Sequence, residues 1–150
     1  MDANAILRAK GAHVVTMPPT AQVMETIQLF KREVFGAVVV VDEENRILGV
    51  VSERNIILGL AKHGAGLLQM SISTLLGDEF LTCHGNDHVK KLMADMVLHR
   101  TRHLPVVDDY GKLCGIISIG DVLNSRMQET ELEAGVLRDA YMAHGVSSGH

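Results

Sequence analysis

The chain has 150 residues, 47% of them hydrophobic and 21% charged, which fits a soluble protein with one globular domain or two small domains sharing a core. Its formal net charge of −4 argues against a nucleic-acid-binding surface, which is normally basic. Residues 1–10 show no signal peptide, and no apolar run approaches the roughly 20 residues of a membrane helix. With two cysteines, Cys83 and Cys114, that form no C-x-x-C motif, we expect a cytoplasmic protein that binds neither nucleic acid nor membrane.

The sequence repeats itself. Shifted by 66 positions, residues 14–57 lie over residues 80–123 without a gap. Gly49 falls on Gly115 and Ser52 on Ser118, and the hydrophobic pattern matches throughout. A solenoid needs at least three units, so two copies indicate a duplicated domain packed about a pseudo-twofold axis.

The first copy begins with an extended segment, residues 13–17, followed by a helix with Thr20 as its expected N-cap. Two apolar runs, residues 37–41 and 47–51, flank a polar turn and predict a β-hairpin. Both runs are apolar at nearly every position, so we expect both faces of each strand to be covered. A second helix begins near Ser52. The first helix carries a stripe of apolar residues at helical spacing, which core packing explains without a ligand. These residues are Val23, Met24, Ile27 and Phe30.

The second copy follows the same order, which gives β-α-β-β-α twice. An extended segment at 80–83 is followed by a helix for which Asn86 or Asp87 is the expected N-cap. Strands at 104–107 and 113–117 and a helix from Ser118 complete the copy. The apolar residues on one face of its first helix are Val89, Leu92, Met93 and Met96. Cys114 is expected in the core. We divide the chain into repeat 1 at 10–65, repeat 2 at 76–126 and a helical tail at 127–145.

The most specific motif is Gly-Ile-Ile-Ser-Ile-Gly-Asp at residues 115–121. A strand ends there, the hydroxyl of Ser118 stands at the helix start, and the carboxylate of Asp121 follows in the first turn. A carboxylate accepts hydrogen bonds from two vicinal hydroxyls, and a helix N-terminus favours phosphate, so the motif suits a ribose phosphate. An ordinary helix cap explains the same residues without a ligand. Recurrence of the motif at residues 49–55 favours the ligand.

These features resemble the CBS-domain family, named after cystathionine β-synthase, over roughly residues 10–125. The resemblance rests on the repeated β-α-β-β-α order, the strand entry Arg-His-Leu-Pro-Val-Val-Asp at 102–108 and the ending Gly-x-x-Ser-x-x-Asp. It implies an α/β (α+β-like) fold of two pseudo-symmetric repeats packed sheet to sheet, here with an additional C-terminal helix. In the family two related clefts between the repeats commonly bind AMP, ADP, ATP, NAD(H) or S-adenosylmethionine.

The resemblance assigns residues to both clefts. In the first, called here the Asp121 cleft, Ser118 and Asp121 hold ribose and phosphate, while the adenine lies near Gly11, His13, Val14, Phe35, Gly36 and Ala37. The second, called here the Asn55 cleft, uses Ser52, Arg54 and Asn55 with Gly77, Glu79, Phe80, Thr101, Arg102 and His103. Asn55 stands where the family usually has Asp, and its amide loses the charge-assisted bond. The Asn55 cleft is therefore expected to be weaker, to bind another ligand, or to depend on Arg54 and Arg102.

Other signals are weaker. His84 and His88 are four residues apart, as are His99 and His103, yet neither pair has a third ligand at a recognisable spacing, so we expect no metal. No nucleophile elbow, P-loop or carboxylate pair is present in the sequence. We therefore expect a regulatory sensor of adenine nucleotides that forms a homodimer and acts on an unknown regulated protein. A nucleotide-processing enzyme and an interaction scaffold with vestigial clefts are the alternatives.

Overall fold

The computed structural model describes residues 1–32 and 36–145. It confirms the order β-α-β-β-α in both repeats, with a helix before the first repeat and two short 3₁₀ helices between the repeats. The elements are α1 (Ala3–Lys10), β1 (Thr16–Met17), α2 (Val23–Arg32), β2 (Ala37–Val41), β3 (Ile47–Ser52), α3 (Glu53–His63), η1 (Gly64–Gln69), η2 (Ile72–Leu75), β4 (Cys83–His84), α4 (Val89–His99), β5 (His103–Val107), β6 (Leu113–Ser118) and α5 (Ile119–Gly145).

Each repeat contains one three-stranded mixed sheet, in the order β1-β2-β3 or β4-β5-β6. The short first strand is parallel to the central strand, and the third strand is antiparallel to it. The registers coincide under the shift of 66 positions, because Ala37 pairs with Ser52 as His103 pairs with Ser118. The duplication read from the sequence is therefore a duplication of backbone pairing.

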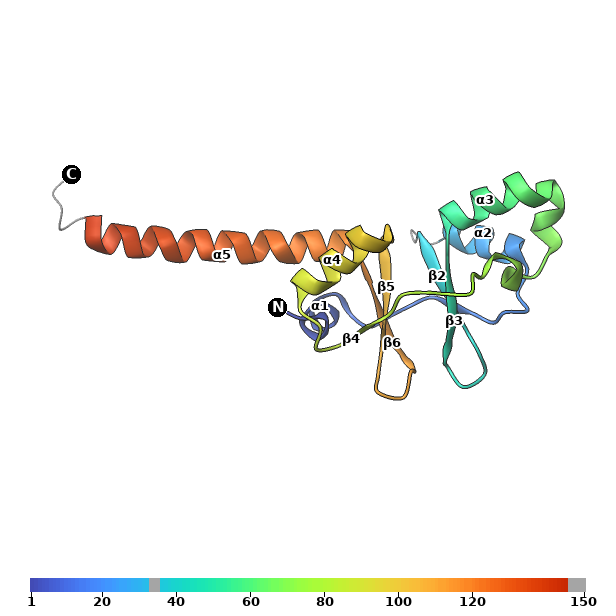
Figure 1. Ribbon diagram of the computed structural model, residues 1–150, viewed down its shortest axis with the longest axis horizontal. Coiled ribbons are helices and arrows are strands. Elements are labelled where there is room, and N and C mark those ends of the chain that lie inside the picture. Colours follow the sequence, from blue (N-terminus) through green and yellow to red (C-terminus); the bar gives the residue numbers. More distant parts are fainter. Residues whose placement is uncertain (33–35, 146–150) are drawn as a thin grey trace.

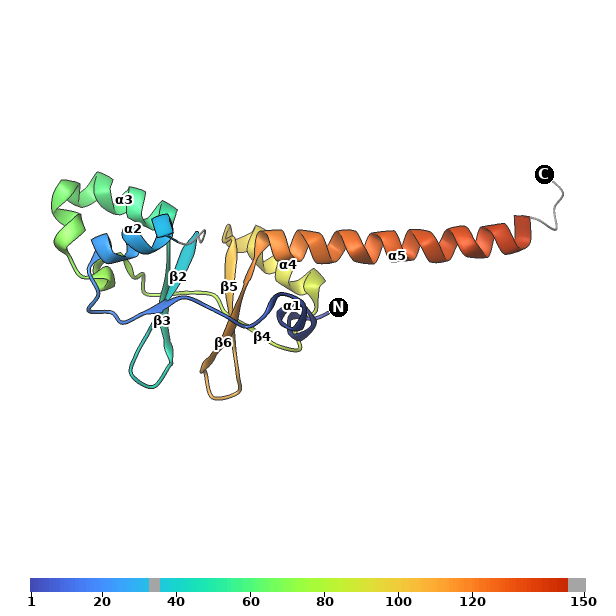
Figure 2. The same cartoon turned by 180° about the vertical axis from the view of Figure 1, so that it is seen from behind.

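The two repeats meet at their hairpins. Arg46 and Lys112, which are equivalent positions, form an antiparallel bridge with each other. Asn45 accepts a backbone hydrogen bond from Leu113 at 3.2 Å and returns one from its side-chain amide to the Leu113 carbonyl at 3.3 Å. Figures 1 and 2 show the two hairpins side by side, with α2 and α3 beyond one and α4 and α5 beyond the other. A contact between equivalent residues is what a pseudo-twofold axis requires.

The strands are covered unequally. Residues 37–40 of the central strand β2 are all buried, whereas β3 alternates between buried and half-exposed residues in its last four positions. The expectation of two covered faces therefore holds for the central strands and is wrong for β3 and β6. Cys114, expected in the core, is exposed because it lies on the open face of the outer strand β6.

The segment that precedes each repeat packs on the other one. α1 precedes repeat 1, yet Ala3 donates to the Asp87 carbonyl at 3.0 Å and Leu7 packs over Gly115, where a Cβ atom would come within 2.8 Å of its side chain. The linker after η2 likewise places Leu76 over Gly49, where a Cβ atom would lie 2.6 Å away. Each core thus contains residues from outside its own repeat, which ties both repeats into one module.

The cap predicted for α4 is wrong by one or two residues. The N-cap is His88, whose Nδ1 accepts a hydrogen bond from the backbone of Lys90 at 3.1 Å. Asp87 instead accepts from the backbone of His84 at 2.9 Å and closes the preceding turn. A neutral imidazole nitrogen serves as a cap acceptor as a short carboxylate does.

The last helix is a single element. α5 begins at Ile119 and continues to Gly145, so the predicted tail continues the closing helix of repeat 2. Its first turns pack against α4 and β6, with Val122 and Ser125 buried. The remainder extends away from both repeats (Figure 1).

Candidate functional site

The centre of the Asp121 cleft is a reciprocal cap where β6 gives way to α5. The Asp121 carboxylate (Oδ2) accepts from the backbone nitrogen of Ser118 at 2.9 Å, and the Ser118 hydroxyl accepts from the backbone nitrogen of Asp121 at 3.2 Å. The capping arrangement considered from the sequence is therefore present. It holds a carboxylate and a hydroxyl at a helix N-terminus, where backbone N–H groups and the positive end of the helix dipole favour an anion.

A third group, Lys10, joins this cap from α1, which packs against β6. Its ammonium group donates to Oδ2 of Asp121 at 2.6 Å and to the carbonyl of Ile116 at 3.0 Å. Lys10 is the last residue of α1, and Gly11 follows it with φ of +94°, a conformation that favours glycine. Beyond this turn the chain crosses from repeat 2 to repeat 1, as Figure 2 shows. The ion pair therefore anchors the start of the segment that leads on to His13 and Val14.

Sequence reasoning missed Lys10. The only available signal was its position next to Gly11, because nothing in the repeat pattern says that α1 packs against the opposite repeat.

The charge on Asp121 is well stabilised. Burial by itself would raise the pKa of its carboxyl group, but the hydrogen bonds from Lys10 and Ser118 and the charge of Lys10 outweigh burial and lower that pKa. The side chains of Lys10 and Asp121 remain 32% and 23% exposed. Asp121 is thus ionised at neutral pH while still accessible to a ligand.

His103 lies beside Gly36 and close to the charges of Lys10 and Asp121. It is the first residue of β5, and a Cβ atom on Gly36 would lie 3.6 Å from its ring, so the ring packs on the glycine backbone. Burial lowers the pKa of His103, as do the charges of Lys10 and Arg102, while Asp121 and Glu53 act in the opposite sense. The resemblance assigned His103 to the Asn55 cleft, and the structure brings it near the charged groups of the Asp121 cleft as well.

The Asn55 cleft has the same cap with different chemistry. The Asn55 amide oxygen accepts from both the backbone nitrogen and the hydroxyl of Ser52, each at 2.8 Å, and the Asn55 backbone donates to that hydroxyl at 3.3 Å. Glu53 N donates to the Gly36 carbonyl at 3.2 Å, as Ile119 N donates to the Arg102 carbonyl at 2.8 Å. The two clefts are therefore equivalent in backbone, and the carboxylate with its lysine distinguishes one of them.

The remaining predicted residues that the structure describes lie on four segments. Ala37 stands beside Ser52 through its strand pairing. Thr101 precedes β5, and its hydroxyl donates to the His103 carbonyl at 3.1 Å. Gly77, Glu79 and Phe80 follow η2 on the stretch that crosses from repeat 1 to repeat 2, and Phe80 is 43% exposed. Arg54 is an exposed residue in the first turn of α3. Phe35 lies outside the described residues.

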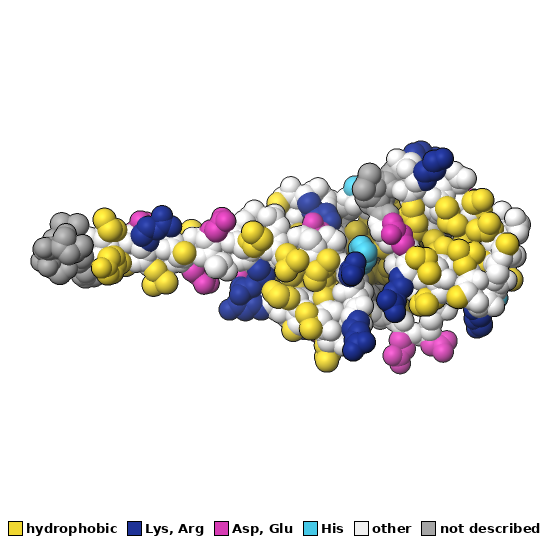
Figure 3. Space-filling model, turned by 90° about the horizontal axis from the view of Figure 1, so that it is seen from above, with side chains coloured by type: hydrophobic (Ala, Val, Ile, Leu, Met, Phe, Trp, Pro, Cys, Tyr) yellow, Lys and Arg dark blue, Asp and Glu magenta, His cyan; other side chains and the backbone are white. Residues whose placement is uncertain are grey.

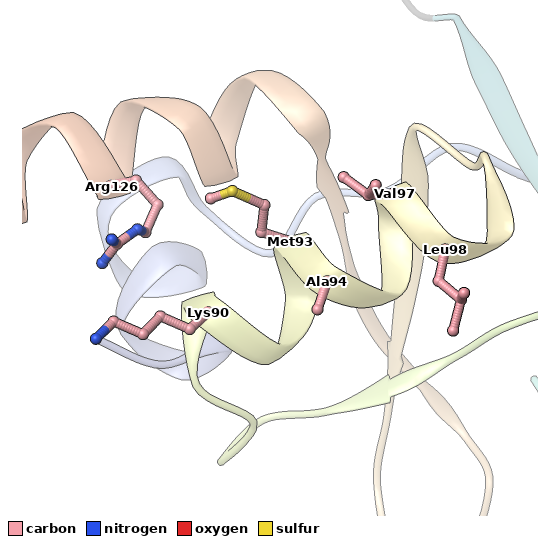
Figure 4. A pocket seen from close by; sticks show the side chains of 6 residues that line it. All are labelled: Lys90, Met93, Ala94, Val97, Leu98 and Arg126. Atoms are coloured by element: carbon pink, nitrogen blue, oxygen red, sulfur yellow. The ribbon is translucent and has the colours of Figure 1, made fainter.

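The surface divides by character. Figure 3 shows hydrophobic side chains over the helices of both lobes, whereas charged side chains and histidine gather along the junction between the lobes. An apolar hollow of about 520 Å³ lies over α4 and α5, lined by Lys90, Met93, Ala94, Val97, Leu98 and Arg126 (Figure 4). A second hollow, of about 390 Å³, lies further along α5. Neither includes a residue assigned to a cleft, and their lining suits another apolar chain better than a nucleotide.

Across residues 1–32 and 36–145, no three His, Cys, Asp or Glu side chains are grouped closely enough to hold a metal ion. His88 caps α4, and its Nε2 atom lies 3.3 Å from the amino group of Met1. Among the described helices, none combines the length and hydropathy needed to cross a bilayer.

The family model for the CBS domain matches residues 10–62 and 72–127. The chain belongs to the CBS-domain family. A crystal structure of a CBS-domain containing protein from Agrobacterium tumefaciens is 37% identical, with a TM-score of 0.78 over 83% of this chain and 92% of that one. The chain nevertheless spans only 56% of the length of one curated relative, to which it is 28% identical.

Two further similar structures contain ligands. A CBS domain pair in complex with 5′-methylthioadenosine and S-adenosyl-L-methionine is 21% identical, with a TM-score of 0.74 over 87% of this chain and 98% of that one. The cytosolic domain of the Mg²⁺ channel MgtE in complex with ATP is 24% identical, with a TM-score of 0.62 over 75% of this chain and 44% of that one. At these identities the likeness establishes the shared fold.

Proposed function

We propose that this CBS pair is a regulatory sensor of adenine nucleotides, AMP, ADP, ATP or NAD(H), which bind in the clefts between the repeats. The observation that carries the proposal is the Lys10–Asp121 ion pair at the Ser118 cap, which brings a carboxylate, a cation and a helix N-terminus together at one place. These are the groups that a ribose phosphate needs.

The ribose is expected at Asp121. Oδ2 already accepts from Ser118 and Lys10, so the second carboxylate oxygen is the natural first acceptor for a ribose hydroxyl. A phosphate on the same ligand attracts the ammonium group of Lys10, and a small swing of its side chain gives it a new anionic partner. Ligand binding then exchanges an internal ion pair for one with the nucleotide.

The Asn55 cleft is the weaker site in this proposal. The Asn55 amide oxygen already accepts two hydrogen bonds within its own cap, and an amide is neutral. Hydrogen bonds to a charged group contribute about 1.5–3 kcal/mol, against about 0.5–1.5 kcal/mol for neutral pairs. Arg54 and Arg102 supply the positive charge for a phosphate there.

Binding rather than catalysis fits the available chemistry. Burial raises the pKa of the Cys83 thiol to about 12, with Asp87 adding to the effect, so this thiol is protonated and a poor nucleophile. The structures that hold adenosyl ligands or ATP on the same fold support the ligand class. We place the protein in the cytoplasm, where its two free thiols stay reduced.

The proposal includes a homodimer and a regulated protein of unknown identity. Its support is the exposed apolar face of the module helices, on which Ile57, Val97 and Leu98 are 65%, 70% and 76% exposed. An apolar helical face of this kind is covered in a symmetric pair, which is the commonest assembly of soluble proteins.

A ligand panel tests the function. Thermal unfolding is measured with AMP, ADP, ATP, NAD⁺, NADH and GMP, and the ligand is recovered afterwards for mass spectrometry. A hundredfold excess over Kd stabilises the native state by about 2.7 kcal/mol, so adenine nucleotides should raise the Tm by several degrees and GMP by less. Conversion of the recovered nucleotide identifies an enzyme instead, and a flat panel identifies a scaffold with vestigial clefts.

A further inference from the structure

The outer part of α5 is a helix that the described part of the chain leaves largely exposed. Glu129 still pairs with the amino group of Met1 at 2.9 Å, but from residue 130 to residue 143 every described residue except the half-exposed Gly135 is exposed. From residue 130 to residue 143 the helix is about 21 Å long, and isolated helices of such length are marginal in water. Gly135 at its middle lowers helix propensity further, by about 1 kcal/mol relative to alanine. A second surface is therefore needed to hold this helix.

One face of α5 carries a heptad pattern. Six residues of α5 are spaced by alternating steps of four and three, so they lie in one stripe along the helix from residue 123 to residue 141. The stripe begins over the module, where Leu123 and Met127 are 49% and 62% exposed, and it ends with Leu137 and Tyr141 at 70% and 65%. Its members are Leu123, Met127, Thr130, Ala134, Leu137 and Tyr141.

The charged residues on either side of the stripe indicate that a second copy of this chain covers it. In a parallel pair of helices, a residue just before one core position faces the residue five places later on the other helix. Arg126, which also pairs with Glu129 of its own chain at 2.8 Å, then faces Glu131 of a second copy, and Glu133 faces Arg138 of a second copy. Both pairs are of opposite charge, and the twofold axis repeats each of them.

The stripe is also continuous with the hollows on the module. The smaller hollow is lined by Leu123, Arg126, Met127, Thr130 and Glu131, and the larger one adjoins it through Arg126. A second α5 lying along the stripe would therefore cover apolar surface of the module as well as the projecting helix. Thr130 and Ala134 are small enough to let two helices approach closely.

We propose that the stripe of α5 packs against the same stripe of a second copy as a parallel two-stranded coiled coil. This pairing places both modules at the same end of the coil. It does not depend on nucleotide binding, so its failure and the failure of the sensor proposal are separable.

Matched substitutions on opposite faces of the helix test the pairing. Leu137 and Leu132 are each 70% exposed, but only Leu137 belongs to the stripe. In analytical ultracentrifugation of the full chain, Leu137→Asp should weaken the dimer by roughly tenfold or more, and Leu132→Asp should leave it unchanged. Equal effects of the two substitutions, or none from Leu137→Asp, would overturn the proposal.

Cross-linking tests the orientation. In a Cys114→Ser background, Ala134→Cys should give a disulfide-linked dimer under mild oxidation, because a parallel, in-register pair places each Ala134 beside its copy. Val136→Cys, on another face, should stay monomeric on a denaturing gel. If Ala134→Cys forms no disulfide, the helices are antiparallel or bind a different partner, and the proposal is wrong.

Discussion

Replacing Lys10 with Met separates recognition of the phosphate from recognition of the nucleoside. The substitution keeps the aliphatic stem and removes the charge that now pairs with Asp121 at 2.6 Å. If the ammonium group moves to the phosphate on binding, Lys10→Met weakens AMP binding. Adenosine carries no phosphate, so its affinity should stay the same or rise, because Asp121 no longer shares its carboxylate with a lysine.

The size of the effect follows from exposure. A charge-assisted hydrogen bond contributes about 1.5–3 kcal/mol, and the pair is 32% and 23% exposed, so the low end of this range applies. About 1.5 kcal/mol corresponds to roughly tenfold in Kd for AMP. Isothermal titration calorimetry with AMP and adenosine measures both affinities.

Arg8→Met is the control, because it removes a positive charge from an exposed residue of the same helix. It should change neither affinity by more than about twofold at physiological ionic strength, where distant surface charges are screened. Equal losses for AMP and adenosine in Lys10→Met would refute the assignment of Lys10 to the phosphate.

Three further predictions follow from single residues. Asn55→Asp should tighten the weaker cleft, whereas Asn55→Ala should cost it less than about tenfold, as two-site calorimetry would show; no change in either variant contradicts the assignment. Gly115→Ala should lower the free energy of unfolding by about 1–3 kcal/mol, because its Cβ would meet Leu7 at 2.8 Å, and Leu7→Ala in the same chain should recover part of the loss in urea denaturation. The pKa of His103 is lowered in the folded state, so the unfolded chain binds a proton first, and stability should fall as pH drops from about 7 through the ordinary histidine pKa of about 6.5. His103→Gln should flatten that fall, and an unchanged pH profile would count against a buried neutral imidazole.

The duplicated fold could be predicted from the sequence because the hydrophobic pattern of a strand also determines its register, that is, which residues it pairs with. The shift that places Ser52 on Ser118 also places their strand partners, Ala37 and His103, on each other. Local patterns did less well where a tertiary contact decides the outcome. The side chain of Cys114 is apolar, yet it is exposed at its place on the outer strand β6.

The residues of the candidate site also differ in whether local sequence or a tertiary contact positions them. Ser118 and Asp121 could be predicted because a strand end and a helix cap are local features. Lys10 could not, because its approach to Asp121 depends on α1 crossing to the other repeat, a contact between residues 111 positions apart. The resemblance assigned His103 to the Asn55 cleft, but its place beside Gly36 and near the charges of Lys10 and Asp121 brings it close to residues of the Asp121 cleft as well.

The most direct test of a nucleotide site at the Ser118 cap is calorimetry of AMP binding to the native protein, to Asp121→Ala and to Asp109→Ala. Asp109 is an exposed carboxylate in the hairpin turn of the same repeat, so its removal controls for the loss of a charge. We expect Asp121→Ala to bind AMP at least roughly tenfold more weakly than the native protein, and Asp109→Ala to bind as the native protein does. If Asp121→Ala binds AMP with native affinity while remaining folded, the carboxylate only caps α5 and the cleft is not the site.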